Sequence, residues 1–179
     1  MVNSVVKLKV GYFLEDRAQE KFLKAIVEKV AEEEGIECST IEHDIRSSTG
    51  GFGQAISEFR KFLRRYGNLK ITPFDLLVVA IDGNCKGFNE METKLRKYAE
   101  QTKYPRMEHV VFAIPDPHIE RWYLDDPKAF MEAVGLNSFP QIPKYKCKKD
   151  IYKQAIEKNL QNAGISSILG GSEYGELIV

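Results

Sequence analysis

Short apolar segments that alternate with helical ones constrain the fold of this chain most strongly. Residues 75–81 (DLLVVAI) and 108–114 (EHVVFAI) are continuous apolar runs, which is typical of strands buried on both faces of a parallel sheet. Residues 5–13 (VVKLKVGYF) and 36–45 (IECSTIEHDI) are partly alternating and predict two further strands. The chain therefore supplies about four strands, each separated from the next by enough residues for a crossover helix.

Amphipathic helices are predicted between these strands. In 16–34, apolar side chains recur every four residues until Gly35. Residues 55–66 present a second apolar face, and 88–103 form a third, more polar helix. The βαβαβαβ order predicts an α/β protein, a Rossmann-like three-layer sandwich with a mostly parallel sheet of about four strands flanked by helices.

The pattern changes after Asp126. Residues 127–134 predict a short helix, a loop rich in proline and lysine follows, and about 150–162 form another helix. We therefore expect an α/β domain over 1–126 and a small helical C-terminal extension over 127–179, packed on the same domain.

Composition is that of an ordinary soluble globule, with 179 residues, 43% hydrophobic and 29% charged. No apolar stretch approaches the roughly 18 residues needed to span a bilayer, and lysines interrupt the N-terminal segment. We expect no membrane partner and a cytoplasmic location, and a homodimer stays open.

Charge and cysteine content limit the chemistry. The formal net charge is zero, so the chain can bind nucleic acid only through a local basic patch. The three cysteines have no CxxC spacing, which predicts neither a zinc site nor a disulfide framework. Buried or incidental thiols are expected, although Cys85 stands out because it follows a strand end.

Acidic residues follow three of the four predicted strands. Glu15 comes directly after the first, Asp82 after the third, and Glu120 one turn into the helix after the fourth. The carboxyl ends of parallel strands meet at one edge of the sheet, where functional groups gather. The sequence therefore predicts that these three acids converge, with Asn84 nearby.

Grouped carboxylates favour a hard divalent cation between them. Mg²⁺ or Mn²⁺ accepts one or two carboxylates plus water and substrate phosphate, and two such ions can clamp a phosphodiester. Glu15, Asp82 and Glu120 are the candidate catalytic residues and metal ligands, with Asn84 as a neutral ligand. The alternatives are an exposed acid for Glu15, a turn role for Asp82, and helix N-terminal stabilisation for Glu120.

Two other acids at these strand ends have a structural interpretation. Asp16 and Asp116 are well placed as helix N-caps, with Pro117 at the first helical position. His118, next along the chain, is either an acid or ligand of the site or a first-turn helix residue.

The combination of acids resembles the Toprim fold, the metal-binding catalytic domain of topoisomerases, primases and OLD-type nucleases. There a glutamate follows the first strand and a Phe-Leu pair lies seven residues on, as Glu15 and Phe22-Leu23 do here. A later Asp-x-Asp resembles Asp82-Gly83-Asn84. Residues 118–126 (HIERWYLDD) are similar to an Ile-Glu-x-Trp-Leu-Leu-x-Asp segment of a little-characterised Toprim-related family of bacteria and archaea.

The resemblance implies a divalent-metal-dependent nuclease, with nucleic-acid processing or defence against phage and other foreign DNA as its setting. It implies that Asp82, Asn84 and Glu120 hold the ion, while Glu15 shares it or acts as general base. Asn84 replaces an acid, Gln19 stands where relatives often carry one, and Asp16 replaces a glycine. A non-catalytic interaction module, or a phosphate-ester hydrolase acting on small nucleotides, therefore stays open.

Clustered basic side chains predict a nucleic-acid partner, DNA or RNA. One cluster is a stripe on the second predicted helix, another surrounds Tyr145, which can stack on a base, and a single arginine lies beside the acids. Solvated surfaces and an ordinary salt bridge are the alternative explanations. The residues are Arg60, Lys61, Arg64 and Arg65; Lys144, Lys146, Lys148 and Lys149; and Arg121.

Overall fold

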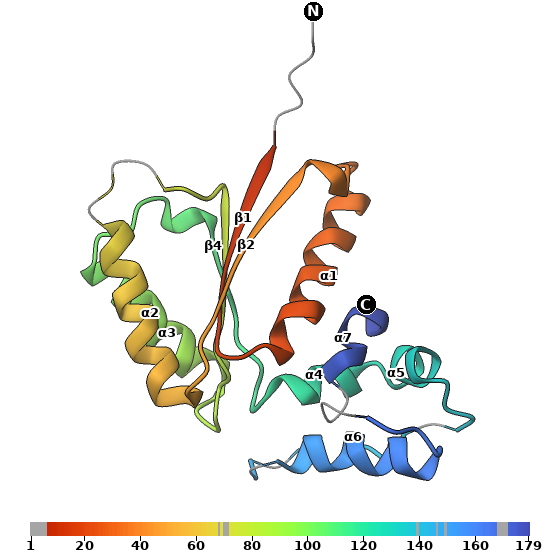
Figure 1. Cartoon of the computed structure of the whole chain (residues 1–179). Coiled ribbons are helices and arrows are strands. Elements are labelled where there is room, and N and C mark those ends of the chain that lie inside the picture. The colour runs from red at the N-terminus through yellow and green to blue at the C-terminus, as the bar shows by residue number, and fades with distance from the viewer. Residues whose placement is uncertain are drawn as a thin grey trace, which may run out of the picture.

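The computed structural model describes residues 7–67, 69, 72–138, 140–145, 147–148, 150–167 and 172–179. Within these residues a four-stranded sheet has the order β2-β1-β3-β4, and every neighbouring pair is parallel. The strands are β1 (Leu8–Leu14), β2 (Ile41–Ser47), β3 (Leu76–Ala80) and β4 (Val110–Ala113). Helices lie on both sides of this sheet, which confirms the predicted three-layer α/β architecture (Figure 1).

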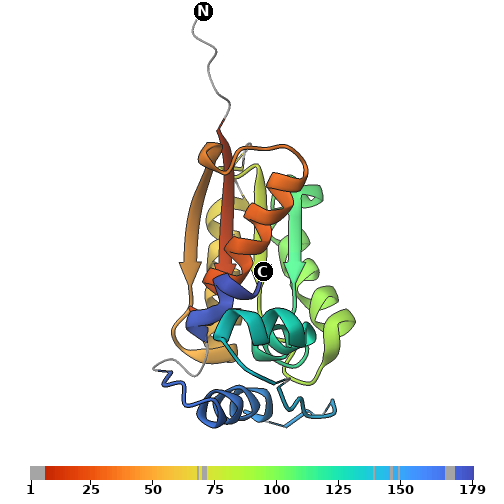
Figure 2. The ribbon, with the colours of Figure 1, turned by 90° about the vertical axis from the view of Figure 1, so that its right-hand side faces the viewer.

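The two faces of the sheet carry separate cores. Helices α2 (Gly51–Gly67) and α3 (Gly87–Gln101) cover one face, and α1 (Ala18–Glu33) covers the other (Figures 1 and 2). Alternation along β1 sends Phe13 toward α2, where it packs on Phe59, and sends Tyr12 toward Leu23 of α1.

The four observed strands differ from the predicted ones in their bounds, most of all at the start of the second. The strand expected over 36–45 begins only at Ile41, because residues 38–40 form a 3₁₀ turn (η1) in which the backbone N–H and the hydroxyl of Thr40 bond the carbonyl of Glu37. The first strand begins at Leu8, and residues 5–6, also expected in it, lie outside the described residues.

Burial on both faces is confirmed for β3 and wrong for β4. Val111 of β4 is 50% exposed, because β4 is an edge strand and α1, which covers that face of the sheet, leaves it partly open. A groove of about 570 Å³ remains there between α1 and strands β3 and β4, with Val27, Val78 and Val111 among its walls.

The C-terminal helices gather below the carboxyl edge of the sheet (Figures 1 and 2). They are α4 (Ile119–Asp125), α5 (Pro127–Val134), α6 (Ile151–Asn162) and α7 (Gly175–Ile178). The short 3₁₀ turn η3 (Ser172–Tyr174) directly precedes α7, and another, η2 (Met107–His109), precedes β4. Tyr123, Phe130, Tyr152 and Ile178 pack in one cluster with Phe22 of α1. These helices therefore share a core with α1 at the edge where the predicted acids lie.

None of the helices in the described part of the chain combines the length and apolar character that crossing a bilayer requires.

Candidate functional site

Glu15 and Asp82 lie in contact at the carboxyl edge. Glu15 directly follows β1, and its backbone N–H continues the ladder to Ala80 of β3 at 2.8 Å. A carboxylate oxygen of Glu15, Oε2, accepts the backbone N–H of Asp82 at 2.9 Å. Both acids are buried, with exposed fractions of 8% and 7%. Because β1 and β3 are paired neighbours in the sheet, residues 67 positions apart meet here.

Gln19 joins these two acids. Its amide nitrogen donates to Oδ1 of Asp82 at 2.9 Å, and its amide oxygen accepts the backbone N–H of Glu15 at 2.9 Å. Gln19 is fully buried, in the first turn of α1. The sequence marked this residue only as a replaced acid, because its bonds to Glu15 and Asp82 depend on how the first turn of α1 is placed against the ends of β1 and β3.

Asp16 caps α1 as predicted. Its Oδ1 accepts the backbone N–H groups of Ala18 at 2.8 Å and Gln19 at 3.3 Å. The cap fixes the start of the helix and therefore the direction in which Gln19 projects toward the acids.

The turns after β3 and β4 are hydrogen-bonded to each other. Gly83 N–H donates to the carbonyl of Pro115 at 2.7 Å, and Asn84 N–H donates to that of Pro117 at 3.0 Å. A β-carbon at Gly83 would lie 3.1 Å from the Pro115 oxygen, so a bare backbone allows this approach. The pairing places the segment that begins α4 against Asp82.

The predicted N-cap at Asp116 is wrong. α4 begins at Ile119, two residues later than a cap at Asp116 with Pro117 in the first helical position would require. The Asp116–Pro117 peptide bond is cis, and the Asp116 carboxylate instead accepts the Tyr145 hydroxyl.

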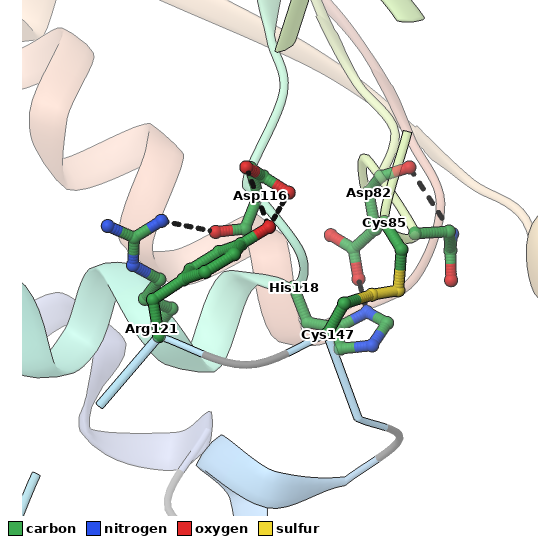
Figure 3. Close-up of a disulfide and its surroundings, with 8 residues drawn as sticks. Asp82, Cys85, Asp116, His118, Arg121 and Cys147 are labelled. Atoms are coloured by element: carbon green, nitrogen blue, oxygen red, sulfur yellow. Dashed lines mark hydrogen bonds and ion pairs between the residues drawn. A yellow bond between two sulfur atoms is a disulfide. The ribbon is translucent and has the colours of Figure 1, made fainter. Parts of the chain in front are cut away.

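His118 and Glu120, at the start of α4, complete the acidic site. Nδ1 of His118 lies 3.2 Å from Oδ2 of Asp82 (Figure 3). Glu120, in the first turn of α4, is half-buried, and the charges of Asp82 and His118 both affect its pKa. The acids predicted to converge therefore occupy one region, and His118 joins them as the N-cap residue of α4.

Burial and mutual repulsion disfavour the charged forms of these acids. Burial first, and then the charge of Asp82, raise the pKa of Glu15 to about 7. Burial also raises the pKa of Asp82, against the opposing effect of His118, and burial followed by the charge of Asp82 raises that of Glu120. The hydrogen bond with Asp82 raises the pKa of His118. A positive charge placed among these groups would relieve the repulsion.

The arrangement fits an open divalent-cation site and not a closed one. No three His, Cys, Asp or Glu side chains among the described residues are grouped so that they could hold a metal ion by themselves. Mg²⁺ needs only one or two carboxylates, with water and substrate phosphate completing the shell. Glu15 and Asp82 provide that pair, and the amide of Asn84 is held beside them by its hydrogen bond to the Asp82 carbonyl at 3.2 Å.

A disulfide lies at the rim of this site (Figure 3). Cys85, next to Asn84, is bonded to Cys147, with the two Cα atoms 5.3 Å apart. The expectation of incidental thiols is wrong for these two residues and holds for Cys38, which is a free thiol. The partners are 62 positions apart, and a disulfide depends on the distance between Cα atoms in the fold, which spacing in the sequence does not supply.

Tyr145 adds non-covalent contacts between the segment that carries Cys147 and the residues at the start of α4. The Tyr145 hydroxyl lies 3.2 Å from both carboxylate oxygens of Asp116, and the Arg121 guanidinium lies 5.0 Å from the centre of the Tyr145 ring. Arg121 also donates to the Asp116 carbonyl at 2.7 Å (Figure 3). Arg121 therefore anchors this segment, and its Nε also lies 3.8 Å from Oδ1 of Asp125, which is the ordinary salt bridge named as the alternative to a phosphate contact.

The predicted basic clusters have different positions relative to the acids. Lys144 and Lys148 are exposed and flank the segment tied to the rim, whereas Lys146 and Lys149 lie outside the described residues. The stripe on α2 runs away from the carboxyl edge, since helix α2 begins there. At about 1.5 Å per residue, its first member is roughly 14 Å along the helix. The stripe comprises Arg60, Lys61, Arg64 and Arg65.

A hollow of about 720 Å³ lies where the end of β2 meets the start of α1. Its walls include Arg17 and Lys21 of the α1 region and the hydroxyl residues Ser47 and Thr49, together with Glu20 and Glu173. Sequence reasoning missed Arg17 and Lys21, because only the fold brings the start of α1 against the end of β2.

Comparison with known proteins gives a single kind of match. A family model described as "Domain of unknown function (DUF4276)" matches residues 14–173, a range that includes every residue of the acidic site and both disulfide cysteines. No curated protein matches, and no solved structure matches.

Proposed function

The chain belongs to the DUF4276 family, and we propose that it is a divalent-metal-dependent nuclease of Toprim type that cleaves phosphodiester bonds in nucleic acid. The observation that carries the proposal is the buried pair Glu15 and Asp82, in which Oε2 of Glu15 accepts the backbone N–H of Asp82 at 2.9 Å, with His118 and Glu120 beside it. Isolated buried acids destabilise a fold, and pairs with raised pKa values are concentrated at functional sites. This pair lies where an open parallel sheet binds its ligands.

Mg²⁺ or Mn²⁺ would be held by the carboxylates of Glu15 and Asp82, with Glu120 and the Asn84 oxygen available as further donors. When bound, such an ion neutralises charge that develops on phosphate oxygens. The expected site is open, because two carboxylates leave room for water and substrate.

The protein's own groups supply positioning and a proton acceptor. Gln19 and His118 hold the two oxygens of Asp82, at 2.9 Å and 3.2 Å, which fixes the carboxylate plane. Glu15, with a pKa of about 7, is partly ionised near neutral pH and suits a general base that takes a proton from attacking water. Such a group typically contributes 10²–10⁴-fold to rate.

Basic side chains favour a nucleic-acid substrate. Arg17 and Lys21 line the hollow at the end of β2, and Lys144 and Lys148 flank the segment that is bonded to Cys85 after β3. A phosphate backbone crossing the site would pass cations on both sides of the acids. The stripe on α2 would serve only a longer substrate that continues around the molecule.

A non-catalytic interaction module is the second candidate. It is favoured by the lack of a three-ligand metal group in the described part of the chain, and by Asn84 standing where an acid would strengthen a second metal position. A module of this kind would bind nucleic acid or protein through the same edge without cutting.

The cellular setting is also part of the proposal. A cytoplasmic location, a role in nucleic-acid processing or phage defence, and a possible homodimer are expected for a Toprim-type nuclease. Sedimentation of the purified protein would test the dimer directly.

The test of nuclease activity uses plasmid DNA and single-stranded RNA, each with Mg²⁺, with Mn²⁺ and with EDTA. Wild type is compared with Glu15→Gln and Asp82→Asn, which keep side-chain size and remove charge. Glu108→Gln is the matched control, because Glu108 is an exposed acid in η2, next to the opposite end of β4. We expect cutting that needs the cation, falls at least about 100-fold in both site variants, and is unchanged in the control.

Metal binding is measured separately, from the electron paramagnetic resonance signal of free Mn²⁺. Binding that both site variants lose, together with cutting, supports the nuclease. Cation-independent nucleic-acid binding without cutting by folded wild type supports the module. Cutting that survives in Glu15→Gln and Asp82→Asn would refute the assigned site.

A further inference from the structure

The bond between Cys85 and Cys147 joins the acidic site to a distant segment of the chain. Cys85 belongs to the turn that follows β3 and carries Asp82, and Cys147 lies between α5 and α6. Both cysteines are exposed to solvent. A thiol reagent can therefore reach this bond in the folded protein, and exposed disulfides are more easily reduced than buried structural ones.

Among the described residues of this segment, the other contacts with the site are non-covalent and exposed. Tyr145 is 52% exposed, and its hydroxyl bonds the Asp116 carboxylate while its ring lies against Arg121. Hydrogen bonds and cation–π contacts in water are individually weak. The covalent bond therefore dominates the attachment of Tyr145 and its flanking lysines to the rim of the site.

We propose that Cys85 and Cys147 form a reversible thiol–disulfide site for a dithiol reductant, which releases Tyr145, Lys144 and Lys148 from the carboxyl edge when the pair is reduced. The proposal goes beyond nuclease activity and does not depend on it. Disulfides of cytoplasmic proteins are usually transient and catalytic or redox-sensing, so the expected location agrees with a reversible bond at this position.

A dithiol reductant supplies both electrons and both protons that reduction of the disulfide requires. One thiolate of the dithiol attacks the exposed sulfur of Cys147, and the Cys85 sulfur leaves as a thiolate. The second thiol of the reductant then attacks the sulfur bonded to Cys147, forms the reductant's own disulfide, and releases the Cys147 thiolate. Two electrons pass to the cysteines, and the two protons of the dithiol complete their thiols.

The experiment uses the full chain, with dithiothreitol as the reductant and trypsin as the probe. Trypsin cuts after lysine, and it reports whether Lys144 and Lys148 are held in place or can enter a protease. We expect thiol titration of the folded protein to rise from one group to three on reduction, and the rate of cutting after Lys144 and Lys148 to rise at least about tenfold. Reoxidation with glutathione disulfide should restore both values.

Cysteine variants separate the bond from other effects of the reductant. Cys85→Ser and Cys147→Ser should be cut quickly with and without reductant, whereas Cys38→Ser should behave as wild type because Cys38 is outside the bond. Circular dichroism of reduced wild type checks that the fold persists, so the result does not depend on the serine variants folding. Equal cutting of oxidised and reduced wild type, or thiols that react only after denaturation, would overturn the proposal.

Discussion

At the scale of single residues, burial changes the ionisation of Glu15 at the carboxyl edge. Its pKa is raised to about 7 from an ordinary 4.5, chiefly by burial. A raised folded-state pKa means that protonated Glu15 favours the folded state. The stabilisation is complete below pH 4.5 and is lost as the pH rises to 7.

We therefore predict that, in EDTA, the free energy of unfolding falls between pH 5 and 7.5, with Glu15 contributing up to about 3 kcal/mol of the change. In Glu15→Gln the fall should be smaller, although Asp82 and Glu120 also have raised pKa values. Urea denaturation at both pH values measures this. An equal fall in wild type and variant would show that Glu15 does not carry it.

Gln19 gives a second prediction at this scale. Gln19→Met keeps the size of the side chain and removes its hydrogen bonds to Glu15 and Asp82. Because it leaves a buried carboxylate with one donor fewer, we expect unfolding free energy to fall by about 1–3 kcal/mol. The control, Gln54→Met, breaks only an exposed bond to Glu58 and should change stability by less than about 0.5 kcal/mol. Similar losses in both would contradict the bridging role.

At the scale of elements, helix periodicity predicted α1, α2, α3, α5 and α6 well, because each buries one continuous apolar stripe. Prediction was poorer where local hydrogen bonds replace strand pairing, as in the 3₁₀ turn before β2. It was also poorer where the conformation of a turn depends on hydrogen bonds to a segment far away in the sequence. The start of α4 is such a case, since its preceding turn is fixed by bonds from Gly83 and Asn84 to carbonyls at 115 and 117.

Two glycines test the packing of elements in opposite directions. A β-carbon at Gly11 of β1 would lie 2.6 Å from the ring of Phe74, so Gly11→Ala should lower the free energy of unfolding by about 1–3 kcal/mol. Gly53, in the first turn of α2, has nothing within 4 Å of that position, and Gly53→Ala should raise stability by up to about 1 kcal/mol. Guanidinium denaturation of the pair checks the sign, which should differ between them.

At the scale of the whole molecule, the Cys85–Cys147 bond links the sheet domain to the C-terminal extension across 62 positions. Closing a loop of that length constrains the unfolded chain, so reduction should lower the free energy of unfolding by about 2–4 kcal/mol. Thermal melts with and without dithiothreitol measure the loss. Cys85→Ser should melt like reduced wild type under both conditions, whereas unchanged melting of wild type on reduction would show that the bond adds no stability.

The sequence by itself determined the α/β class, the parallel sheet and the acids at its carboxyl edge, because strand and helix periodicities are local and connection rules are few. Tertiary structure alone decided the partners of those acids. Gln19, His118, the hollow beside β2 and the disulfide all arise from contacts between segments far apart in the chain. Such contacts depend on which strands become neighbours and on how far a side chain reaches across the carboxyl edge of the sheet. Local periodicity in the sequence determines neither of these.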